Sequence, residues 1–381
     1  MRPQVRGSAH SLLMFADIID SSKFGAVLEY EEYADRVLEF QESFIALGRR
    51  YFPKPADTTV AYCRVEARGD EGTIFVMDVD EDPPDLVLRA IEFLMHLKGC
   101  LKMTPMSQQR DKSPTQIGLG AGIHFGTVAY ATSLDRDNHA QIARLEGFAI
   151  NYAKRVESSS RDGGNSRIML SEAAFRLVEG APVTFKRILT PMKGIGECVE
   201  VYEVCGGIFR IQIAPKDQPG EQRLVARCRE LAAQPGRIDE QWMKSLIISV
   251  LDQLIQQPLF SQQRSEYQRL QEKLAWYSCD EDDPVLLFIR ARMYGAAGQH
   301  TQQLRYLREI LQRYPGFVHV KKAMIEACSV IAKCGAECLE KVYARDMARE
   351  FLERYPELLD SVEREKFESV IRELGTSLIE K

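Results

Sequence analysis

The sequence predicts an α+β domain followed by an all-α domain. Strand and helix patterns alternate over the first 205 residues, and helical periodicity alone continues from there to the end of the chain. The Gly- and Pro-containing stretch 207–221 separates the two patterns and is typical of a linker. We therefore expect an α+β domain over 1–206, a linker over 207–221 and a helical domain over 222–381.

The first half of the α+β domain begins with a buried apolar strand at 11–18. A helix follows, because Tyr33, Val37, Phe40 and Phe44 recur at helical spacing and form one apolar face. Two strands joined by a turn are expected next, at 60–66 and 72–78. A helix is then expected to begin after Pro83-Pro84, and a long strand region to cover 116–131. This β-α-β-β-α-β order is the ferredoxin-like arrangement.

The second half of the domain adds one helix and three short strands. The helix is expected from Gly147 to about Ser160, where the run Asp162-Gly163-Gly164 ends it. The strands are expected at 167–170, 184–189 and 198–204.

The helical part contains one internal repeat. Residues 308–315 recur as residues 349–356, and both copies end in Arg-Tyr-Pro. The offset exceeds the 34 residues of a regular tetratricopeptide repeat, so we expect a degenerate helical-repeat domain with a regulatory or sensor role. An unspecialised helical bundle fits the same pattern.

Composition excludes several classes of protein. The net charge of −5, without a long Lys/Arg block, gives no reason to expect a nucleic-acid partner. We expect no signal peptide and no membrane span, because no apolar run is long enough. Nine scattered cysteines without a C-x-x-C pair indicate neither a disulfide framework nor a zinc ribbon. We therefore expect a cytoplasmic protein.

Two aspartates and a downstream Asn–Arg pair carry the chemistry. Asp17 ends the apolar strand expected at 11–18. Asp70 lies in the Arg68-Gly69-Asp70 turn, just before the strand expected at 72–78. Asn151 and Arg155 are four residues apart, so they share one face of the third helix. Paired carboxylates with an Asn/Arg clamp are suited to phosphoryl transfer.

These residues belong to an ordered set of motifs, and through them the first 206 residues resemble a class III nucleotidyl cyclase catalytic domain. The motifs are Phe15-Ala16-Asp17-Ile18, Gly69-Asp70, Gly122 through Gly126, Gly147 through Arg155, Ser171 and Lys193-Gly194. The resemblance implies that a ribose 3′-hydroxyl attacks the α-phosphorus of a nucleoside triphosphate and that pyrophosphate leaves.

The resemblance assigns a role to each site residue. Asp17 and Asp70, with the Ile18 carbonyl, are expected to bind two Mg²⁺ or Mn²⁺ ions per active site, and hard oxygen ligands suit these cations. Asn151 is expected to orient the ribose, and Arg155 to stabilise charge on the α-phosphate in the transition state.

Phosphate contacts are expected from Ser21, Ser22 and the backbone N–H groups that follow Asp17, and from Lys193. Asp20 and Ser21 stand where many family members have Gly and Phe, which departs from the family pattern. A turn lysine without function is the alternative for Lys193. His124 lies within a strand pattern, and we expect it to be a packed core histidine.

The resemblance also implies a head-to-tail homodimer with composite sites. In the family, the metal-binding aspartates of one subunit face the Asn/Arg helix of the other. A single chain therefore cannot complete a site.

Glu66 and Arg144 occupy the two positions that select the base in the family. Adenylate cyclases typically offer Lys with Asp or Thr, and guanylate cyclases Glu with Cys, so this pair fits neither pattern. Ionised Glu accepts and Arg donates, which matches the N3–H and the carbonyl oxygens of uracil. Guanine offers a similar edge, but the length of Arg favours a pyrimidine. The alternative is that the two residues form a salt bridge or that Arg144 faces solvent.

The unusual pair and the added C-terminal region are similar to the bacterial anti-phage Pycsar cyclases, which make cyclic UMP or cyclic CMP. The sharper hypothesis is conversion of UTP to cyclic UMP as an antiviral messenger, with a protein or phage-derived activator acting on the C-terminal domain. The alternatives are a cytidylate cyclase, a bacterial guanylate or adenylate cyclase, and an inactive cyclase-fold sensor module.

Overall fold

The computed structural model describes most of the chain. It covers residues 5–19, 21, 30–53, 62–77, 82–102, 118–134, 140–212, 241–256, 287–288, 291–292, 294–295, 299–314, 320–333, 338–356 and 361–379. Two compact units divide the chain: the first comprises Met1–Glu179, Val183–Glu230 and Glu240–Val250, and the second comprises the remainder.

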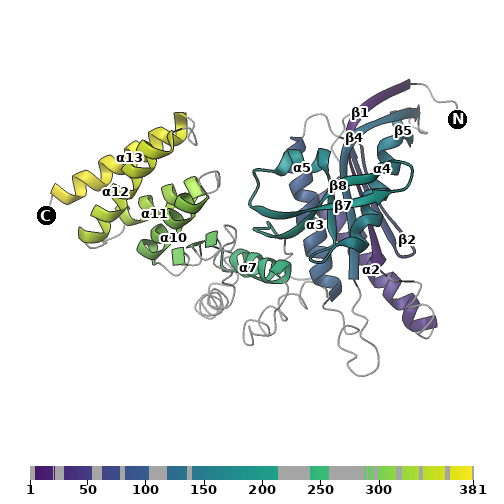
Figure 1. The fold of residues 1–381 in the computed structure, drawn as a ribbon, viewed down its shortest axis with the longest axis horizontal. Helices are drawn as coiled ribbons and strands as arrows, with labels where there is room; N and C mark the ends of the chain where they lie inside the picture. Colours follow the sequence, from purple (N-terminus) through teal and green to yellow (C-terminus); the bar gives the residue numbers. More distant parts are fainter. Residues whose placement is uncertain are drawn as a thin grey trace. The chain divides into compact units, whose positions relative to one another are not determined.

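The first half of unit one is the expected β-α-β-β-α-β arrangement (Figure 1). Its elements are β1 (Val5–Ile19), α2 (Tyr30–Tyr51), β2 (Tyr62–Arg68), β3 (Glu71–Met77), α3 (Pro83–Lys102) and β4 (Gly118–Leu134). The strands pair antiparallel in the order β2-β3-β1-β4, so the ferredoxin-like prediction is confirmed.

The second half extends this sheet beyond β4. Its elements are β5 (Ala140–Glu146), α4 (Phe148–Ser158), the 3₁₀ turn η2 (Ser159–Asp162), β6 (Ile168–Ser171), α5 (Glu172–Val178), β7 (Val183–Met192) and β8 (Gly196–Gly207). β6 pairs parallel with β4, β8 pairs with β6, and β7 pairs with β8 to form the edge of the sheet. β5 is a branch of the sheet that pairs with β4. The sequence did not predict β5 or the seven-residue α5.

Helices cover both faces of the sheet. Successive side chains of β1 point to opposite faces, so alternate residues of this strand pack against the helices of opposite faces. Leu13 and Phe15 pack with Ala149 and Ala153 of α4 in one core cluster. On the other face, α2 approaches the sheet so closely that a Cβ on Gly72 would meet the Phe44 ring at 2.4 Å. Residue 17 follows the period of 13 and 15 and therefore lies on the α4 face.

Glycines of β4 allow α4 and η2 to approach the sheet. A Cβ on Gly122 would lie 2.1 Å from the Glu157 nitrogen, and one on Gly120 would lie 2.2 Å from Ser160 Oγ. The Gly118–Gly122 run is thus a strand segment packed against α4 and η2. His124 follows on the same face, and its Nδ1 lies 2.8 Å from Ser171 Oγ while its ring meets Tyr152 edge-on. The prediction of a packed core histidine is confirmed.

Residues 241–250 complete the first unit, although they follow the predicted linker. They form the first part of α7 (Gln241–Gln256). Trp242 is buried beneath the Lys98 ammonium, which lies 4.6 Å from the ring centroid, and Ser249 Oγ accepts from the Phe209 nitrogen at 3.1 Å. Of the predicted linker, residues 213–221 lie outside the described residues.

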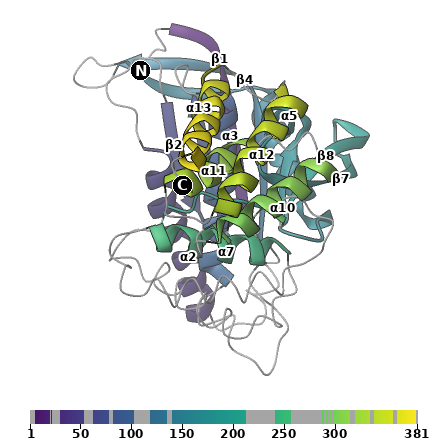
Figure 2. The ribbon, with the colours of Figure 1, turned by 90° about the vertical axis from the view of Figure 1, so that its left-hand side faces the viewer.

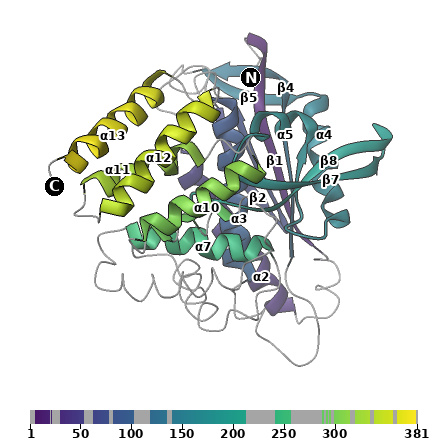
Figure 3. The ribbon, with the colours of Figure 1, turned by 60° about the vertical axis from the view of Figure 1, so that its left-hand side comes forward.

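From residue 251 onward, the described secondary structure of the second unit consists of helices. Its helices α10 (His300–Arg313), α11 (Val320–Lys333), α12 (Cys338–Arg354) and α13 (Ser361–Ile379) lie beside one another in chain order (Figure 2 and Figure 3). Residues 308–313 of the first copy of the internal repeat lie on α10, residues 349–354 of the second lie on α12, and the two copies contact each other. Arg308 pairs with Glu350 at 2.9 Å, and Tyr355 Oη donates to the Leu311 carbonyl at 3.4 Å.

Of the described helices, none combines the length and the apolar character that crossing a membrane requires.

Candidate active site

Asp17 and Asp70 meet where β1 ends and β3 begins. Asp17 is the register partner of Glu71 on β3, and the Ile18 nitrogen donates to the Asp70 carbonyl at 3.1 Å. Gly69 precedes Asp70 with a φ of 59°, a left-handed conformation that glycine adopts without steric cost. The structure therefore brings the two predicted carboxylates and Ile18 together.

Ser21 holds Asp70 in the described structure. Its hydroxyl donates to Asp70 Oδ2, and the side chain is buried. The predicted phosphate contact of Ser21 would require this hydrogen bond to rearrange or be shared. Ser22 and the following residues of the predicted phosphate-binding segment lie outside the described residues.

The surroundings of Asp17 are strongly acidic. Burial, and then the charges of Glu157, Asp70 and Glu71, raise the pKa of Asp17 to about 7, whereas Lys154 acts in the opposite direction. A carboxylate in such a place is stabilised by any added cation. The site therefore attracts positive charge.

The donor set fits Mg²⁺ or Mn²⁺. Within the part of the chain that the structure describes, no three His, Cys, Asp or Glu side chains are arranged to hold a metal by themselves. Mg²⁺ does not need such a cage, because it is usually bound by one or two carboxylates together with water and substrate phosphates. Asp17 and Asp70 supply that number of hard oxygen ligands.

Two glutamates and a lysine at this site were not predicted. Lys154 Nζ contacts Glu71 Oε2 and lies 2.8 Å from Glu157 Oε2. Glu71 directly follows Asp70 in the sequence. Lys154 and Glu157 are three residues apart on α4, a spacing that predicts an ion pair on the helix surface. Their convergence depends on the packing of α4 over β1 and β3, which the sequence does not specify.

Asn151 and Arg155 lie on the outer side of α4. The helix begins after Gly147, and it turns Ala149, Ala153 and Val156 toward the sheet. Asn151 and Arg155 share the opposite, exposed face with each other, as their four-residue spacing predicts. Both side chains are therefore accessible to a molecule that approaches from outside.

Glu66 lies on β2 between two arginines. Its carboxylate pairs with Arg64 at 2.6 Å and with Arg68 at 3.9 Å, since alternate residues of a strand share one face. Arg144 lies in β5, opposite Ala131 of β4, and its side chain is outside the described residues. The joint role of Glu66 and Arg144 stays a prediction.

Lys193 is exposed in the turn between β7 and β8, where Gly194 has a φ of 78°. β4, β6 and β8 lie between β1 and β7, which separates the two strands by about 19 Å at the usual strand spacing. Lys193 thus belongs to a different part of the sheet from the Asp17 strand of its own chain.

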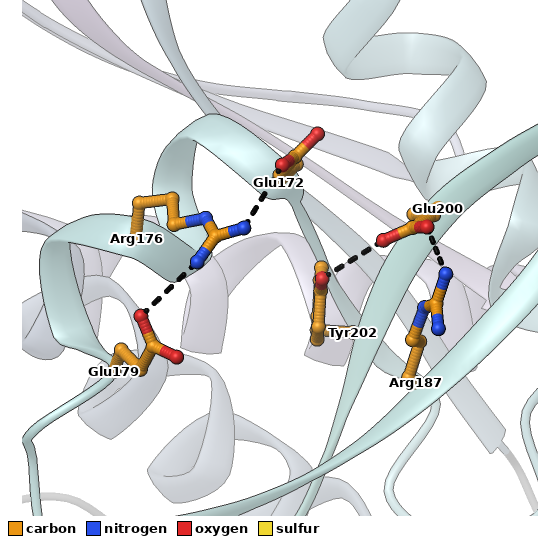
Figure 4. Close-up of polar contacts among 6 residues, drawn as sticks. All are labelled: Glu172, Arg176, Glu179, Arg187, Glu200 and Tyr202. Atoms are coloured by element: carbon orange, nitrogen blue, oxygen red, sulfur yellow. Dashed lines mark hydrogen bonds and ion pairs between the residues drawn. The ribbon is translucent and has the colours of Figure 1, made fainter.

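Polar contacts brace the hairpin that carries Lys193 (Figure 4). Arg187 of β7 pairs with Glu200 of β8, and Tyr202 Oη donates to the same carboxylate at 3.0 Å. Beside them on α5, Arg176 bonds with Glu172 and Glu179, and Phe175 stacks on the Tyr202 ring at 3.8 Å. These contacts hold β7 and β8, the two strands that the Lys193 turn connects, to each other and to α5.

The chain was compared with known proteins at three levels. No family model and no curated protein matches it. Among solved structures, it is similar to the adenylyl cyclase CyaB from P. aeruginosa, with 16% identity and a TM-score of 0.42 over 53% of this chain and 96% of that one. It is also similar to the guanylate cyclase domain of RhGC from Catenaria anguillulae, with 19% identity and a TM-score of 0.38 over 52% and 97%. The guanylyl cyclase Cya2 gives 15% identity and a TM-score of 0.41 over 54% and 95%.

Proposed function

We propose that this protein is a nucleotidyl cyclase that converts a nucleoside triphosphate, UTP in preference, to its 3′,5′-cyclic monophosphate and pyrophosphate. The observation that carries the proposal is the meeting of Asp17 and Asp70 in an acidic site at the end of a central strand. The exposed Asn151–Arg155 pair on α4 supplies the second half of the chemistry.

In the proposed reaction, the ribose 3′-oxygen attacks the α-phosphorus, its proton passes to solvent, and the bond to the β-phosphate oxygen breaks. Divalent cations held by Asp17, Asp70 and the Ile18 carbonyl would acidify the 3′-hydroxyl and neutralise the triphosphate. The Asn151 amide would orient the ribose by hydrogen bonding.

Arg155 and Lys193 would act on the phosphates. The Arg155 guanidinium would donate to the α-phosphate oxygens, where charge develops in the transition state. Lys193 would hold the terminal phosphates as a point charge, since an ammonium has no fixed donor geometry. Both side chains are exposed and therefore need no rearrangement of the core to reach a ligand.

The proposed active form is a head-to-tail homodimer. Asn151 and Arg155 face away from their own sheet, and Lys193 lies several strands from Asp17. A second copy that places its α4 and its β7–β8 turn over Asp17 and Asp70 would complete a site. By symmetry, the same contact would complete a second one.

The proposed base is uracil. Glu66 would accept from N3–H, with Arg64 and Arg68 holding its carboxylate, and Arg144 would donate to a carbonyl oxygen. Purified full-length protein should be incubated with each of the four nucleoside triphosphates and Mn²⁺. Cyclic UMP is the expected main product, and cyclic GMP or cyclic AMP would overturn the pyrimidine assignment.

Two variants separate the metal role from the fold. Asp17→Ala and Asp70→Ala should abolish turnover while the circular dichroism spectrum stays that of the parent. An undiminished rate in either variant would refute the cation role. Absence of any cyclic product from the parent would favour the inactive sensor module instead.

The proposed biological role is synthesis of a messenger in defence against phage, with the helical unit as regulator. A chain that ends after α7 should be compared with the full chain, because residues 241–250 belong to the first unit. A changed rate in the shortened chain would support regulation by the helical unit, and an identical rate would oppose it.

A further inference from the structure

Lys154 places its ammonium in the acidic site, where side chains from three elements contact it. It extends from α4 toward the sheet, where its ammonium bonds with Glu71 at the start of β3 and with Glu157 one turn further along α4. The ammonium also lies 5.6 Å from the Phe15 ring centroid on β1. Three elements that meet beside Asp17 therefore hold this one side chain.

The two glutamates are held as firmly as the lysine. The Glu157 side chain is only 7% exposed, and its carboxylate reaches Lys154 from the adjacent turn of the helix. Glu71 pairs in register with Asp17, so its backbone is fixed in the sheet. Although burial alone lowers it, the bonds to Glu157 and Glu71 raise the pKa of Lys154, which keeps the ammonium charged.

Without Lys154 the site would present a different set of ligands. Asp70, Glu71 and Glu157 are three carboxylates that lie close enough to Asp17 to raise its pKa. Ca²⁺ takes six to eight oxygen ligands in flexible geometry, whereas Mg²⁺ is bound by one or two carboxylates and keeps several waters. Among the described residues no three carboxylates converge on one point while Lys154 holds two of them. Released from Lys154, Glu71 and Glu157 would be free to turn toward Asp17 and Asp70. Four carboxylates would then suit the larger cation, whereas Asp17 and Asp70 alone suit the smaller one.

We propose that Lys154 is a positioning residue that sets cation choice: it keeps Glu71 and Glu157 as its own partners, so that an entering cation meets Asp17 and Asp70 only. The inference rests on the proposed cation role of these two aspartates. It assigns Lys154 no contact with the nucleotide.

The test is binding of the metal alone to the full-length chain, measured by titration calorimetry with Mg²⁺ and with Ca²⁺ in the absence of nucleotide. Lys154→Met keeps the length of the side chain and removes its charge. It should tighten Ca²⁺ binding by at least about tenfold, because Glu71 and Glu157 become available to a cation that takes six to eight oxygen ligands, and should tighten Mg²⁺ binding less. Unchanged affinities for both cations would overturn the proposal.

Three further variants make the result specific. Lys154→Arg retains the charge and should restore the parent preference. Adding Glu71→Gln and Glu157→Gln to Lys154→Met should cancel the gain in Ca²⁺ affinity. If the gain persists, it does not come from the two released glutamates, and the proposal fails. Lys186→Met removes an exposed lysine on β7 and should leave both affinities at the parent values.

One arm of the test does not depend on the folding of the Lys154 variants. In the parent background, Glu71→Gln should leave Mg²⁺ affinity within about twofold, because this glutamate is not a ligand, whereas Asp17→Asn should weaken it strongly. If Glu71→Gln weakens Mg²⁺ as much as Asp17→Asn does, the proposal fails. If Asp17→Asn has no effect, the cation role in the proposed function fails instead.

Discussion

Gly122 of β4 lies directly beneath the backbone of Glu157 in α4, so close that a Cβ at position 122 would come within 2.1 Å of the Glu157 nitrogen. The contact is backbone against backbone, and neither side can yield by a change of rotamer. The height of α4 above the sheet is therefore set at this point.

Gly122→Ala should lift the end of α4 and displace Lys154 and Arg155 together. We expect a loss of about 1–3 kcal/mol in the free energy of unfolding, as for other overpacked cores, and a lower rate of product formation. Urea unfolding followed by circular dichroism measures the first. Gly164→Ala is the matched control, since nothing lies within 4 Å of a Cβ there, and its stability should equal that of the parent.

Asp17→Asn should stabilise the cation-free protein above neutral pH. The pKa of Asp17 is about 7 in the folded chain and 3.8 when unperturbed, so the folded state holds a proton that the unfolded state releases between these values. Stability therefore falls as pH rises through this window, and the asparagine removes the fall. Thermal melting in EDTA should show the variant above the parent at pH 8 and equal to it near pH 4.

The same melting experiment with Mn²⁺ should reverse the order. A cation that binds only the folded state raises the melting temperature of the parent, and Asp17→Asn should not respond. Asp346→Asn, an exposed change in the helical unit, should behave as the parent in both conditions. A parent melting temperature that Mn²⁺ does not move would contradict the prediction.

Arg155→Ala should lose activity without losing stability, because the side chain is exposed on the outer face of α4. If the active form is the proposed head-to-tail dimer, mixing inactive Asp17→Asn and Arg155→Ala chains should restore activity. Random pairing gives about a quarter of the parent rate, since half of the dimers carry one intact site of two. A mixture as inactive as its components would argue against composite sites.

Glu203→Gln should destabilise the loop that follows η2. The buried Glu203 carboxylate accepts from the backbone nitrogens of Gly164, Asn165 and Arg167 at 2.7–3.2 Å, and from the Asn165 side chain at 3.0 Å. An amide nitrogen in place of one oxygen would face a donor, at a cost of roughly 1–3 kcal/mol in urea unfolding. Glu197→Gln, on the same strand but exposed, should cause no measurable loss.

The strands that carry the candidate site could be predicted from the sequence, because their signals are local. Asp17 ends an apolar run, Asp70 lies in a glycine turn, and the four-residue spacing of Asn151 and Arg155 fixes their common face. The order of these strands and helices was then enough to predict the ferredoxin-like part of the sheet.

The missed features depend on tertiary packing. α5 has only seven residues, too few for a helical period to emerge, and β5 lies off the main path of the sheet. The contact between Lys154 and Glu71 joins residues 83 positions apart, and it exists only because α4 crosses β1 beside β3. No single-sequence pattern encodes that crossing.

The burial of Trp242 against Lys98 has a consequence for chimeric proteins. Because residues 241–250 complete the first unit, that unit is discontinuous in sequence. A foreign sensor grafted at residue 206 would uncover the indole and leave the Lys98 ammonium without its aromatic neighbour. A graft placed after α7 would keep both, so the end of this helix is the natural point at which to join the first unit to a foreign domain.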